Sequence, residues 1–428
     1  MIDRSKAPEV KPFGFRKLPQ DSIERLDNGV SFHTLSGGTA SLVQLTLLFP
    51  GGKSDVDNSN IPTMASGLVS EGAGPYSGSE IADSLDFAGA TFSPHSSKHY
   101  TGLSTVVLSH KLPDILPLLR AMTEEPHFEE RDIENLKNLL AARLRMDERK
   151  VLFRAQTAFN QLIYGAGHHQ AIVPTVEQIE TVDRATLAKF HGSLVKPERM
   201  HAYLAGSLDK RTTEAVKDFL NSLYAPEPEA KGIELRREIP RPEPAQTVFT
   251  EMPEAVQSAI YAGVPAIRRD EKDFINLRLA VMALGGYFGS RLMTNIREEK
   301  GLTYHIESYL ASQHEDGMVV IQAQCNSDNV GEVEDEIRKE MRLMAENPPE
   351  GRELERLKLT AMTRLVETLD SPLSVMAYRQ LELVTGTPRD YFEAQERAIA
   401  AISPEIMANM AAKYLRPEQL RVSIAGPR

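Results

Sequence analysis

Two stretches of this sequence recur at nearly one separation, and this internal repeat limits the folds open to the chain more than any other feature. The stretch EERDIENLKNLL at residues 129–140 aligns with EGRELERLKLTA at residues 350–361, an offset of 221. VKPERMHAYLAGS from Val195 aligns with LRPEQLRVSIAGP from Leu415, an offset of 220. Because the two matches lie far apart within each half, we expect a duplicated domain, with a period far longer than that of a solenoid repeat.

A charged, proline-rich stretch lies between the two copies. Residues 224–244, YAPEPEAKGIELRREIPRPEP, have little apolar periodicity, which is typical of a surface linker. A chain of 428 residues is also too long for one ordinary core, since domains contain roughly 100 to 200 residues. We therefore predict an N-terminal domain at residues 1–223, a linker at residues 224–244 and a C-terminal domain at residues 245–428.

The order of the predicted elements in the first copy indicates an α+β fold. A strand pair is followed by two helices, a second strand pair and two more helices, at residues 30–49, 61–71, 79–87, 90–93, 100–108, 111–123 and from 129 onward. Hairpins that alternate with helical layers favour a mostly antiparallel sheet packed with helices over a doubly wound parallel sheet. We expect this architecture in both homologous halves.

The composition excludes several classes of protein. A share of 41% hydrophobic and 25% charged residues is typical of a globular chain, and a net charge of −11 without a basic patch argues against nucleic-acid binding. No apolar run approaches the ~20 residues needed to span a bilayer. Residues 1–19 lack the apolar core of a secretory signal, which predicts a cytoplasmic protein; a removed leader would leave the same pattern in a periplasmic one.

The stretch LGGYFGSRLMTNIREEKGLTY at residues 284–304 combines three local patterns. Three glycines lead into a helical apolar stripe formed by Leu292, Met293 and Ile296. Gly301 then stands where a helix ends, so that Arg297 falls in the last turn of a short helix and Tyr304 on the strand that follows. On spacing alone, the two side chains are a cation at the C-terminal end of a helix dipole and a tyrosine in the core.

The duplicated halves, the linker and the stretch RLMTNIREEKGLTY together resemble the M16 peptidases, the family of pitrilysin, insulin-degrading enzyme and the mitochondrial processing peptidase. The resemblance extends from about Asp21 to the C-terminus. Two further stretches support it, EGAGPYSGSEIADSLDFAGATF from Glu71 and YGAGHHQAIVPTVEQIETVD from Tyr164. It implies a small two-domain bacterial member of the family.

The same resemblance implies a zinc site that this chain has lost. Catalytic M16 members carry His-x-x-Glu-His on the first helix, where the histidines bind zinc and the glutamate activates water, and a third ligand, a glutamate, on a later helix. Thr63, Ser66 and Gly67 occupy the first three of these positions, and Ala141 and Ala142 stand where the later glutamate would lie. We therefore expect no zinc or other cofactor on this chain and no peptidase activity by the chain alone.

Other residues do not replace this site. His95 and His99 lie across a strand turn, and His168 and His169 fall in a loop segment of the family, with no acidic residue near either pair at ligand spacing. The lone Cys325 lies in a strand-like run without a histidine nearby, so we expect a buried spectator thiol. The chain also has no GxSxG elbow, and LGGYFGS lacks the lysine of a phosphate-binding loop.

What remains is the arginine and tyrosine of the family. M16 members that cleave peptides use these two residues, seven positions apart in the C-terminal half, to hold substrate carbonyls near the zinc, and Arg297 and Tyr304 match that spacing. Both side chains can donate to a peptide carbonyl and to its developing oxyanion. Several M16 enzymes are heterodimers in which one subunit bears the zinc. The resemblance thus implies a non-catalytic subunit that contributes Arg297 and Tyr304 to the zinc site of a partner.

The implied partners are a zinc-bearing M16 paralogue, with self-association as the alternative, and an unfolded peptide bound as an added strand. In the family the peptide pairs with the edge strand that corresponds to residues 90–96, where Pro94 removes one donor. Two other functions stay open. One is a structural or assembly protein derived from the family, like the core subunits of a respiratory complex; the other is a self-contained hydrolase with a relocated site. A scaffold has no need of Arg297 and Tyr304, which favours the peptidase subunit.

Overall fold

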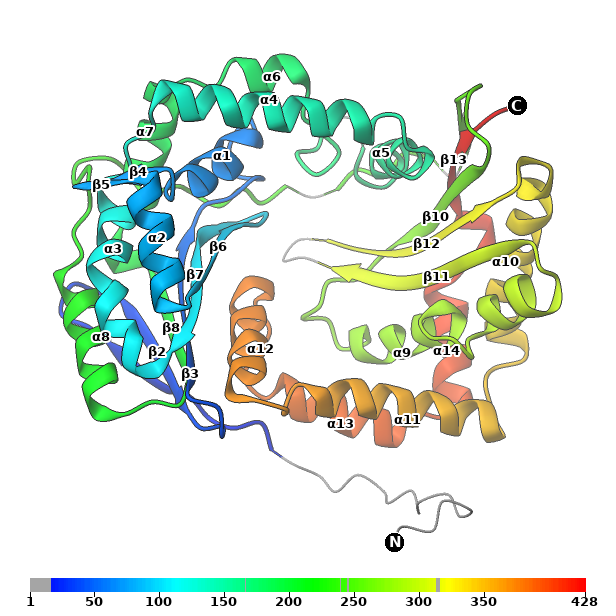
Figure 1. Cartoon of the computed structure of the whole chain (residues 1–428). Helices are drawn as coiled ribbons and strands as arrows, with labels where there is room; N and C mark the ends of the chain where they lie inside the picture. Colours follow the sequence, from blue (N-terminus) through cyan, green and yellow to red (C-terminus); the bar gives the residue numbers. More distant parts are fainter. Residues whose placement is uncertain (1–16, 166, 239, 245, 313–315) are drawn as a thin grey trace, which may run out of the picture.

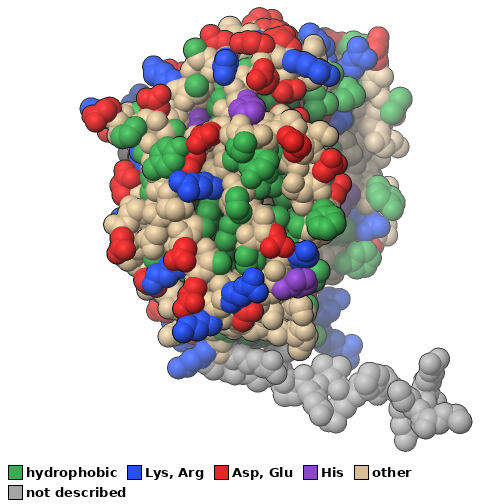
Figure 2. Space-filling view, turned by 60° about the vertical axis from the view of Figure 1, so that its left-hand side comes forward, with side chains coloured by type: hydrophobic (Ala, Val, Ile, Leu, Met, Phe, Trp, Pro, Cys, Tyr) green, Lys and Arg blue, Asp and Glu red, His purple; other side chains and the backbone are tan. Residues whose placement is uncertain are grey.

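The computed structural model describes residues 17–165, 167–238, 240–244, 246–312 and 316–428. Most of the N-terminal segment that suggested a cytoplasmic protein lies outside these ranges. None of the helices within them is both long and apolar enough to cross a lipid bilayer. On the face presented in Figure 2, acidic and basic side chains are interspersed around small hydrophobic areas.

The first half of the chain contributes one sheet and the helices that pack on it (Figure 1). Its elements are β1 (Ser22–Arg25), β2 (Ser31–Ser36), β3 (Leu42–Pro50), α1 (Asn60–Leu68), β4 (Gly72–Ala73), β5 (Tyr76–Ser77), α2 (Gly78–Ala88), β6 (Thr91–Ser96), β7 (Tyr100–Leu108), η1 (Ser109–Lys111), α3 (Leu112–Glu124), α4 (Glu130–Asp147), α5 (Val151–Tyr164), α6 (Val176–Glu180), α7 (Arg184–Leu194), η2 (Pro197–Arg199), β8 (His201–Gly206) and α8 (Lys210–Ser222). The strand order in the main sheet is β1-β2-β8-β3-β7-β6.

The second half contributes another sheet with its own helices. Its elements are β9 (Thr247–Glu251), β10 (Ser258–Ala266), α9 (Phe274–Gly285), η3 (Met293–Glu299), β11 (Thr303–Ser312), β12 (Gly317–Cys325), η4 (Ser327–Asn329), α10 (Val330–Glu346), α11 (Gly351–Glu367), α12 (Pro372–Thr385), α13 (Tyr391–Ala401), α14 (Pro404–Tyr414), η5 (Pro417–Gln419) and β13 (Arg421–Gly426). The strand order is β11-β12-β10-β13-β9.

The two sheets repeat one topology. Traversed from its other edge, the second sheet runs β9-β13-β10-β12-β11, which matches the order β2-β8-β3-β7-β6 in the first. The strand directions correspond as well. β2 is parallel to β8 and β9 is parallel to β13, whereas the remaining neighbours in these two five-strand orders are antiparallel. The helices α5 and α12 both contain 14 residues and begin at Val151 and Pro372, as the sequence offset of 221 requires. The predicted α+β fold of two homologous halves is therefore confirmed.

The helix α2 illustrates how local sequence sets an element. Ser77 and Glu80 form a capping box, in which the Glu80 N–H donates to the Ser77 hydroxyl and the Ser77 N–H donates to the Glu80 carboxylate. The helix ends at Gly89, whose φ of 62° is a left-handed conformation that glycine adopts without strain. Ile81, Leu85 and Ala88 face the core between these caps. The predicted helix at residues 79–87 thus needs only local signals.

The two halves exchange helices. α5 leaves the first half and packs Phe159 and Ile163 against Tyr261 in the second sheet. α12 leaves the second half and packs Met376 against Tyr203 in the first sheet. Since α5 and α12 are repeat counterparts, the exchange is reciprocal, and Figure 1 shows each helix beside the other half's sheet. The halves consequently share buried apolar surface, which holds them in one orientation.

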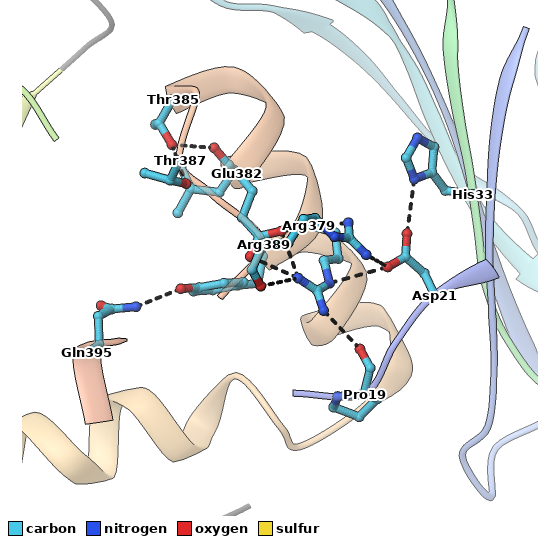
Figure 3. A network of polar contacts seen from close by, with 11 residues as sticks. Pro19, Asp21, His33, Arg379, Glu382, Thr385, Thr387, Arg389 and Gln395 are labelled. Atoms are coloured by element: carbon cyan, nitrogen blue, oxygen red, sulfur yellow. Dashed lines mark hydrogen bonds and ion pairs between the residues drawn. The ribbon is translucent and has the colours of Figure 1, made fainter. Parts of the chain in front are cut away.

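A buried charge network also joins the two halves (Figure 3). Asp21, just before β1, hydrogen-bonds His33 Nδ1 at 3.0 Å and pairs with Arg379 Nε at 3.3 Å. Arg389 also contacts Asp21, and Arg379 pairs with Glu382 at 2.8 Å. Burial by itself would raise the pKa of Asp21, but hydrogen bonds with His33 and Arg389 outweigh it and lower this pKa to about 2. The network ties the start of the chain to α12 and the loop after it.

Candidate substrate-binding site

Arg297 lies on η3, a π-helix. The Lys300 N–H donates to the Asn295 carbonyl, five residues earlier, at 3.1 Å. The predicted apolar stripe is confirmed, since its three members are buried: Leu292, Met293 and Ile296. The sequence predicted a short helix, but its apolar spacing does not distinguish an α-helix from a π-helix. Because π-helical segments are rare and often occur at functional sites, the conformation itself marks this segment.

Polar contacts fasten η3 to the two helices behind it. Arg291, just before η3, donates two hydrogen bonds to the Glu353 carboxylate of α11, at 2.8 and 3.1 Å. Asn295 donates to Glu336 of α10 at 2.7 Å, and Lys300 pairs with the same carboxylate at 3.1 Å. Burial acts to raise the pKa of Glu336, but hydrogen bonds from Asn295 and two lysines lower it to about 2. These residues therefore hold the helix in place, and Arg297 takes part in none of these contacts.

The Arg297 guanidinium makes cation–π contacts with two aromatic rings. Its Cζ atom lies 5.3 Å from the ring centroid of Phe288 and 5.2 Å from that of Tyr304. The rings are largely exposed, Phe288 by 64% and Tyr304 by 87%. Arg297 itself is half-buried, and across the described residues no carboxylate pairs with it, so its N–H donors are not used in an ion pair. Each exposed cation–π contact contributes about 0.5–1 kcal/mol, which orients the guanidinium without using its donors.

Tyr304 is the extra residue of a β-bulge. Thr303 pairs with Cys325 of β12. His305 pairs with Gln324, which directly precedes Cys325 in β12. Tyr304 therefore has no partner in the ladder. A bulge reverses the alternation of inward and outward side chains, and the phenol therefore points out although the residue two positions later is buried. The interpretation of Tyr304 as a core residue is wrong for this reason.

Gly301 connects the two irregular segments. Its φ of 64° is left-handed, and an added Cβ would meet no atom within 4 Å, so the backbone conformation and not space requires glycine here. The turn allows the Leu302 N–H to donate to the Ile296 carbonyl at 3.0 Å. It also folds the chain back so that Tyr304 lies against Arg297. The predicted end of the helix at Gly301 is confirmed.

The pair lies far from the first half of the same chain. In Figure 1 the end of β11 and the start of β12 lie toward the first half, so the start of β11 lies at the opposite end. Tyr304 is the second residue of this strand, which ends at Ser312. At about 3.3 Å per residue, Tyr304 is separated from Ser312 by roughly 26 Å. Tyr304 thus lies at the end of β11 that is remote from the first half.

The five positions of the lost zinc motif lie on two helices that pack together. Thr63, Ser66 and Gly67 are on α1, where the Ser66 hydroxyl donates to the Thr63 carbonyl at 3.2 Å. Gly67 faces α4, and Ala141 on that helix is buried, whereas Ala142 is exposed. The fold brings these helices together as the resemblance implies, but the five positions carry the hydroxyls of Thr63 and Ser66, no side chain at Gly67 and the methyl groups of the two alanines, which are poor zinc ligands.

One group of potential metal ligands occurs elsewhere in the described residues, formed by His168, His169 and Glu238, whose ligand atoms lie within 4.8 Å of one another. The expectation that no acidic residue lies near these histidines is therefore wrong, because Glu238 is contributed by the linker about seventy positions later. His168 nevertheless has both ring nitrogens engaged, with the Glu238 carbonyl at 3.2 Å and the Gln170 N–H at 3.2 Å. Glu238 Oε2 contacts His169 Nδ1 at 3.2 Å. These contacts fasten the linker to the loop after α5 and leave His168 no lone pair for a metal.

Two further predictions concern single strands. β6 is an edge strand, as expected for residues 90–96, and Pro94 stands opposite Leu103 of β7. Cys325 is buried at the end of β12, and this burial raises the pKa of its thiol to about 11. The thiol is therefore protonated at neutral pH and unreactive, which confirms the expected spectator role.

The described structure is thus a duplicated α+β chain in which α1 and α4 pack together without a histidine or a carboxylate at the five positions above, and in which Arg297 contacts the exposed ring of Tyr304. The family model described as "Peptidase M16 inactive domain" matches residues 181–360. The chain is thus related to the M16 peptidases, and the matched part corresponds to the inactive domain of that family, which confirms the predicted resemblance.

Individual relatives agree with this assignment. "Uncharacterized zinc protease YmxG" of Bacillus subtilis is 24% identical over 360 residues, covering 78% of this chain and 86% of that protein. "Non-peptidase homolog YmxG" of Helicobacter pylori is 23% identical over 265 residues, covering 61% and 60%. Among solved structures, the peptidase M16 inactive domain from Pseudomonas fluorescens has a TM-score of 0.86 at 21% identity, covering 95% of this chain and 98% of that one. A protease from Helicobacter pylori has a TM-score of 0.84 at 16% identity, with 96% and 100% covered. These structures share the fold of this chain.

The sequence patterns did not identify Phe288 as part of the site. It lies in the glycine-rich segment between α9 and η3, where periodicity carries no information about which side chain faces a neighbour. An aromatic residue exposed between glycines could have been singled out, because such a side chain has no local structural use.

Proposed function

We propose that this protein is the non-catalytic subunit of a heterodimeric M16 zinc peptidase and that Arg297 and Tyr304 bind the substrate backbone at the zinc site of the partner subunit. The observation that carries this proposal is the contact between half-buried Arg297 and the exposed ring of Tyr304, at the end of β11 remote from the chain's own first half. A guanidinium without a described carboxylate partner and an unburied phenol suit contact with a peptide presented by another chain.

The residues on the chain's own α1 and α4 also support the proposal that the partner subunit, and not this chain, carries the zinc. They pack against each other and carry Ser66, Gly67 and Ala141 where the family resemblance would place the base and two ligands. A zinc-bearing M16 paralogue would supply the metal and the water-activating glutamate. The substrate would be an unfolded peptide, which can pair with an edge strand through its backbone.

The test is a mixing experiment. The protein is combined with a zinc-bearing M16 paralogue from the same genome, and cleavage of an unfolded peptide is compared with that of each chain alone. We expect cleavage only by the mixture, and a loss of about 10²–10³-fold in kcat for Arg297→Ala, since removal of one oxyanion donor has that effect. Size-exclusion chromatography should show that the complex still forms.

Two control variants match this perturbation. Phe87 is 85% exposed, and the Lys111 ammonium lies 5.4 Å from its ring centroid, so Phe87→Ala and Lys111→Ala remove a comparable exposed pair on the other half. Neither should change cleavage. Full activity of the Arg297→Ala mixture, or stoichiometric zinc in the isolated chain, would refute the proposal. A stable homodimer that binds no zinc-bearing paralogue would favour the structural or assembly role instead.

A further inference from the structure

A pocket of about 490 Å³ lies beside the edge strand of the second sheet. Residues of α9, β11 and α11 form its walls, and α12 and α13 close it. Much of the lining is apolar and includes Leu279, Leu310 and Leu365. Apolar walls lower the local dielectric constant, so a charged contact inside is stronger than the same contact in water.

The internal repeat relates the position of this pocket to an equivalent position in the first half. α9, β11 and α11 are the counterparts of α1, β6 and α4 in the first half by sheet order and by order along the chain, and α4 and α11 also begin 221 positions apart. In the first half these elements surround the lost zinc motif and the edge strand. The pocket therefore occupies the corresponding place in the second half, beside another free strand edge.

Two guanidinium groups reach the pocket from different helices. Arg278 of α9 donates to the Gln395 side-chain carbonyl, and Arg364 of α11 donates to the Gly286 carbonyl at 2.8 Å. No ion pair to either arginine is found within the described ranges. Burial above all, and then repulsion by Arg269 and Arg364, lower the pKa of Arg278. Arg278 is thus a half-buried cation without an ion pair, Arg364 is an exposed one at the same pocket, and an anion that contacts both would be stabilised.

A buried relay adds a neutral donor. Gln395 is 2% exposed, and its Nε2 donates to the Tyr378 hydroxyl at 2.6 Å. Because this hydroxyl already accepts a hydrogen bond, its own proton is free for an acceptor in the pocket that Tyr378 lines. Glu307 is the one carboxylate in the lining, and it is hydrogen-bonded to Gln322 on the neighbouring strand. The donors in the pocket therefore outnumber the acceptors.

The strand next to the pocket can hold a peptide. β11 is the edge of its sheet, so one row of its backbone N–H and C=O groups is unpaired in the described chain. Ser308, Tyr309 and Leu310 of this strand line the pocket. An extended segment paired with β11 would place alternate side chains over it.

We propose that this pocket binds a carboxylate of an extended peptide that pairs with β11, supplied by an acidic side chain or by the C-terminus of the peptide. Arg278 and Arg364 take the carboxylate oxygens, and the Tyr378 hydroxyl adds a third donor. The inference rests on the proposed function only in that both require a peptide ligand. It needs neither zinc nor a partner subunit.

The isolated protein can be titrated with short dye-labelled peptides by fluorescence anisotropy. One pair of amidated peptides differs by Glu against Gln at a central position, and a second pair carries Gln with a free or an amidated C-terminus. We expect at least one carboxylate-bearing peptide to bind more tightly than its neutral match. Arg364→Gln should weaken that binding by about tenfold or more, as a charge-assisted hydrogen bond is removed. The pair that shows the difference identifies the source of the carboxylate.

Arg352→Gln is the matched control, since this exposed residue lies on the same helix three turns earlier and outside the pocket. It removes the same charge and should leave binding unchanged. Arg278→Gln tests the second guanidinium, with circular dichroism to verify folding; if it unfolds, Arg364→Gln decides alone. Equal binding of charged and neutral peptides, no binding of any peptide, or no effect of Arg364→Gln would overturn the proposal.

The two proposals fail separately. Cleavage by the mixture that depends on Arg297 but shows no preference for carboxylates would refute the pocket and leave the subunit role standing. Carboxylate-dependent binding by the isolated chain, with no cleavage in any mixture, would do the reverse.

Discussion

Replacing Asp21 by asparagine should weaken the contact between the two halves of the chain. The Asp21 side chain is fully buried and pairs with Arg379 and Arg389. Its pKa of about 2 lies below the ordinary value of 3.8, and this difference corresponds to about 2 kcal/mol of stability at neutral pH. Asp21→Asn also leaves Arg379 buried with one fewer partner, so the total loss should be about 2–4 kcal/mol.

The pH dependence identifies the cause. Because the pKa of Asp21 is lower in the folded than in the unfolded protein, its contribution is present in full well above pH 4. It is lost as the pH falls through 3.8 and then below about 2, because the carboxyl is protonated first in the unfolded and then in the folded protein. The free-energy difference between the native protein and Asp21→Asn should therefore shrink over this interval.

Urea unfolding followed by circular dichroism measures this difference at pH 7 and at steps between pH 4 and pH 2. Asp57→Asn is the matched control, since Asp57 also pairs with an arginine, Arg236, but is 95% exposed. It should change the free energy of unfolding by less than about 1 kcal/mol. Equal stability of Asp21→Asn and the native protein at pH 7, or a deficit that stays constant down to pH 2, would refute the reasoning.

Four further changes test separate features, each by denaturant unfolding unless stated. Gly301→Ala should cost about 1 kcal/mol, because a side chain is disfavoured at its φ of 64°; a neutral result would contradict this conformation. Gly331→Ala, where the new Cβ meets no atom within 4 Å in α10, should instead stabilise by about 0.5 kcal/mol through helix propensity. Phe159→Ala removes a ring that is 1% exposed between α5 and the second sheet and should cost about 3–5 kcal/mol; a much smaller loss would argue against the helix exchange. Cys325 should not react with a thiol reagent at pH 8 until the protein is unfolded, and rapid native labelling would contradict its burial.

Much of the fold could be predicted from the sequence because the relevant patterns are local. The capping box at Ser77 and the apolar spacing of Leu292 and Ile296 are set by neighbours within a few positions. The repeat at an offset of 220–221 predicted two homologous halves without any knowledge of their packing. The absence of zinc ligands at Ser66 and Gly67 could likewise be read from the motif, and the structure places both on the expected helix.

The candidate site could be predicted only in part from local sequence patterns. Spacing drew attention to Arg297 and Tyr304, but it also predicted a buried tyrosine, because period-two alternation assumes a regular strand. A bulge depends on how β11 registers with β12, which is a contact between residues about twenty positions apart. The π-helical turn of η3, the contact of Phe288 with Arg297 and the approach of Glu238 to His169 all depend on similar non-local contacts.

The sequence by itself determined the duplicated α+β architecture, the apolar stripe before Arg297 and the helix end at Gly301, since these follow from the internal repeat, from residue identity and from short-range periodicity. Only the tertiary structure decided that α5 and α12 are exchanged between the halves, that Tyr304 faces outward beside Arg297, and that two arginines without a described ion pair share a pocket at the edge of β11. The physical reason is that each of these properties depends on two segments of the chain that contact each other. Burial and charge compensation depend on what lies opposite a side chain, and the chain supplies that neighbour from a distant position.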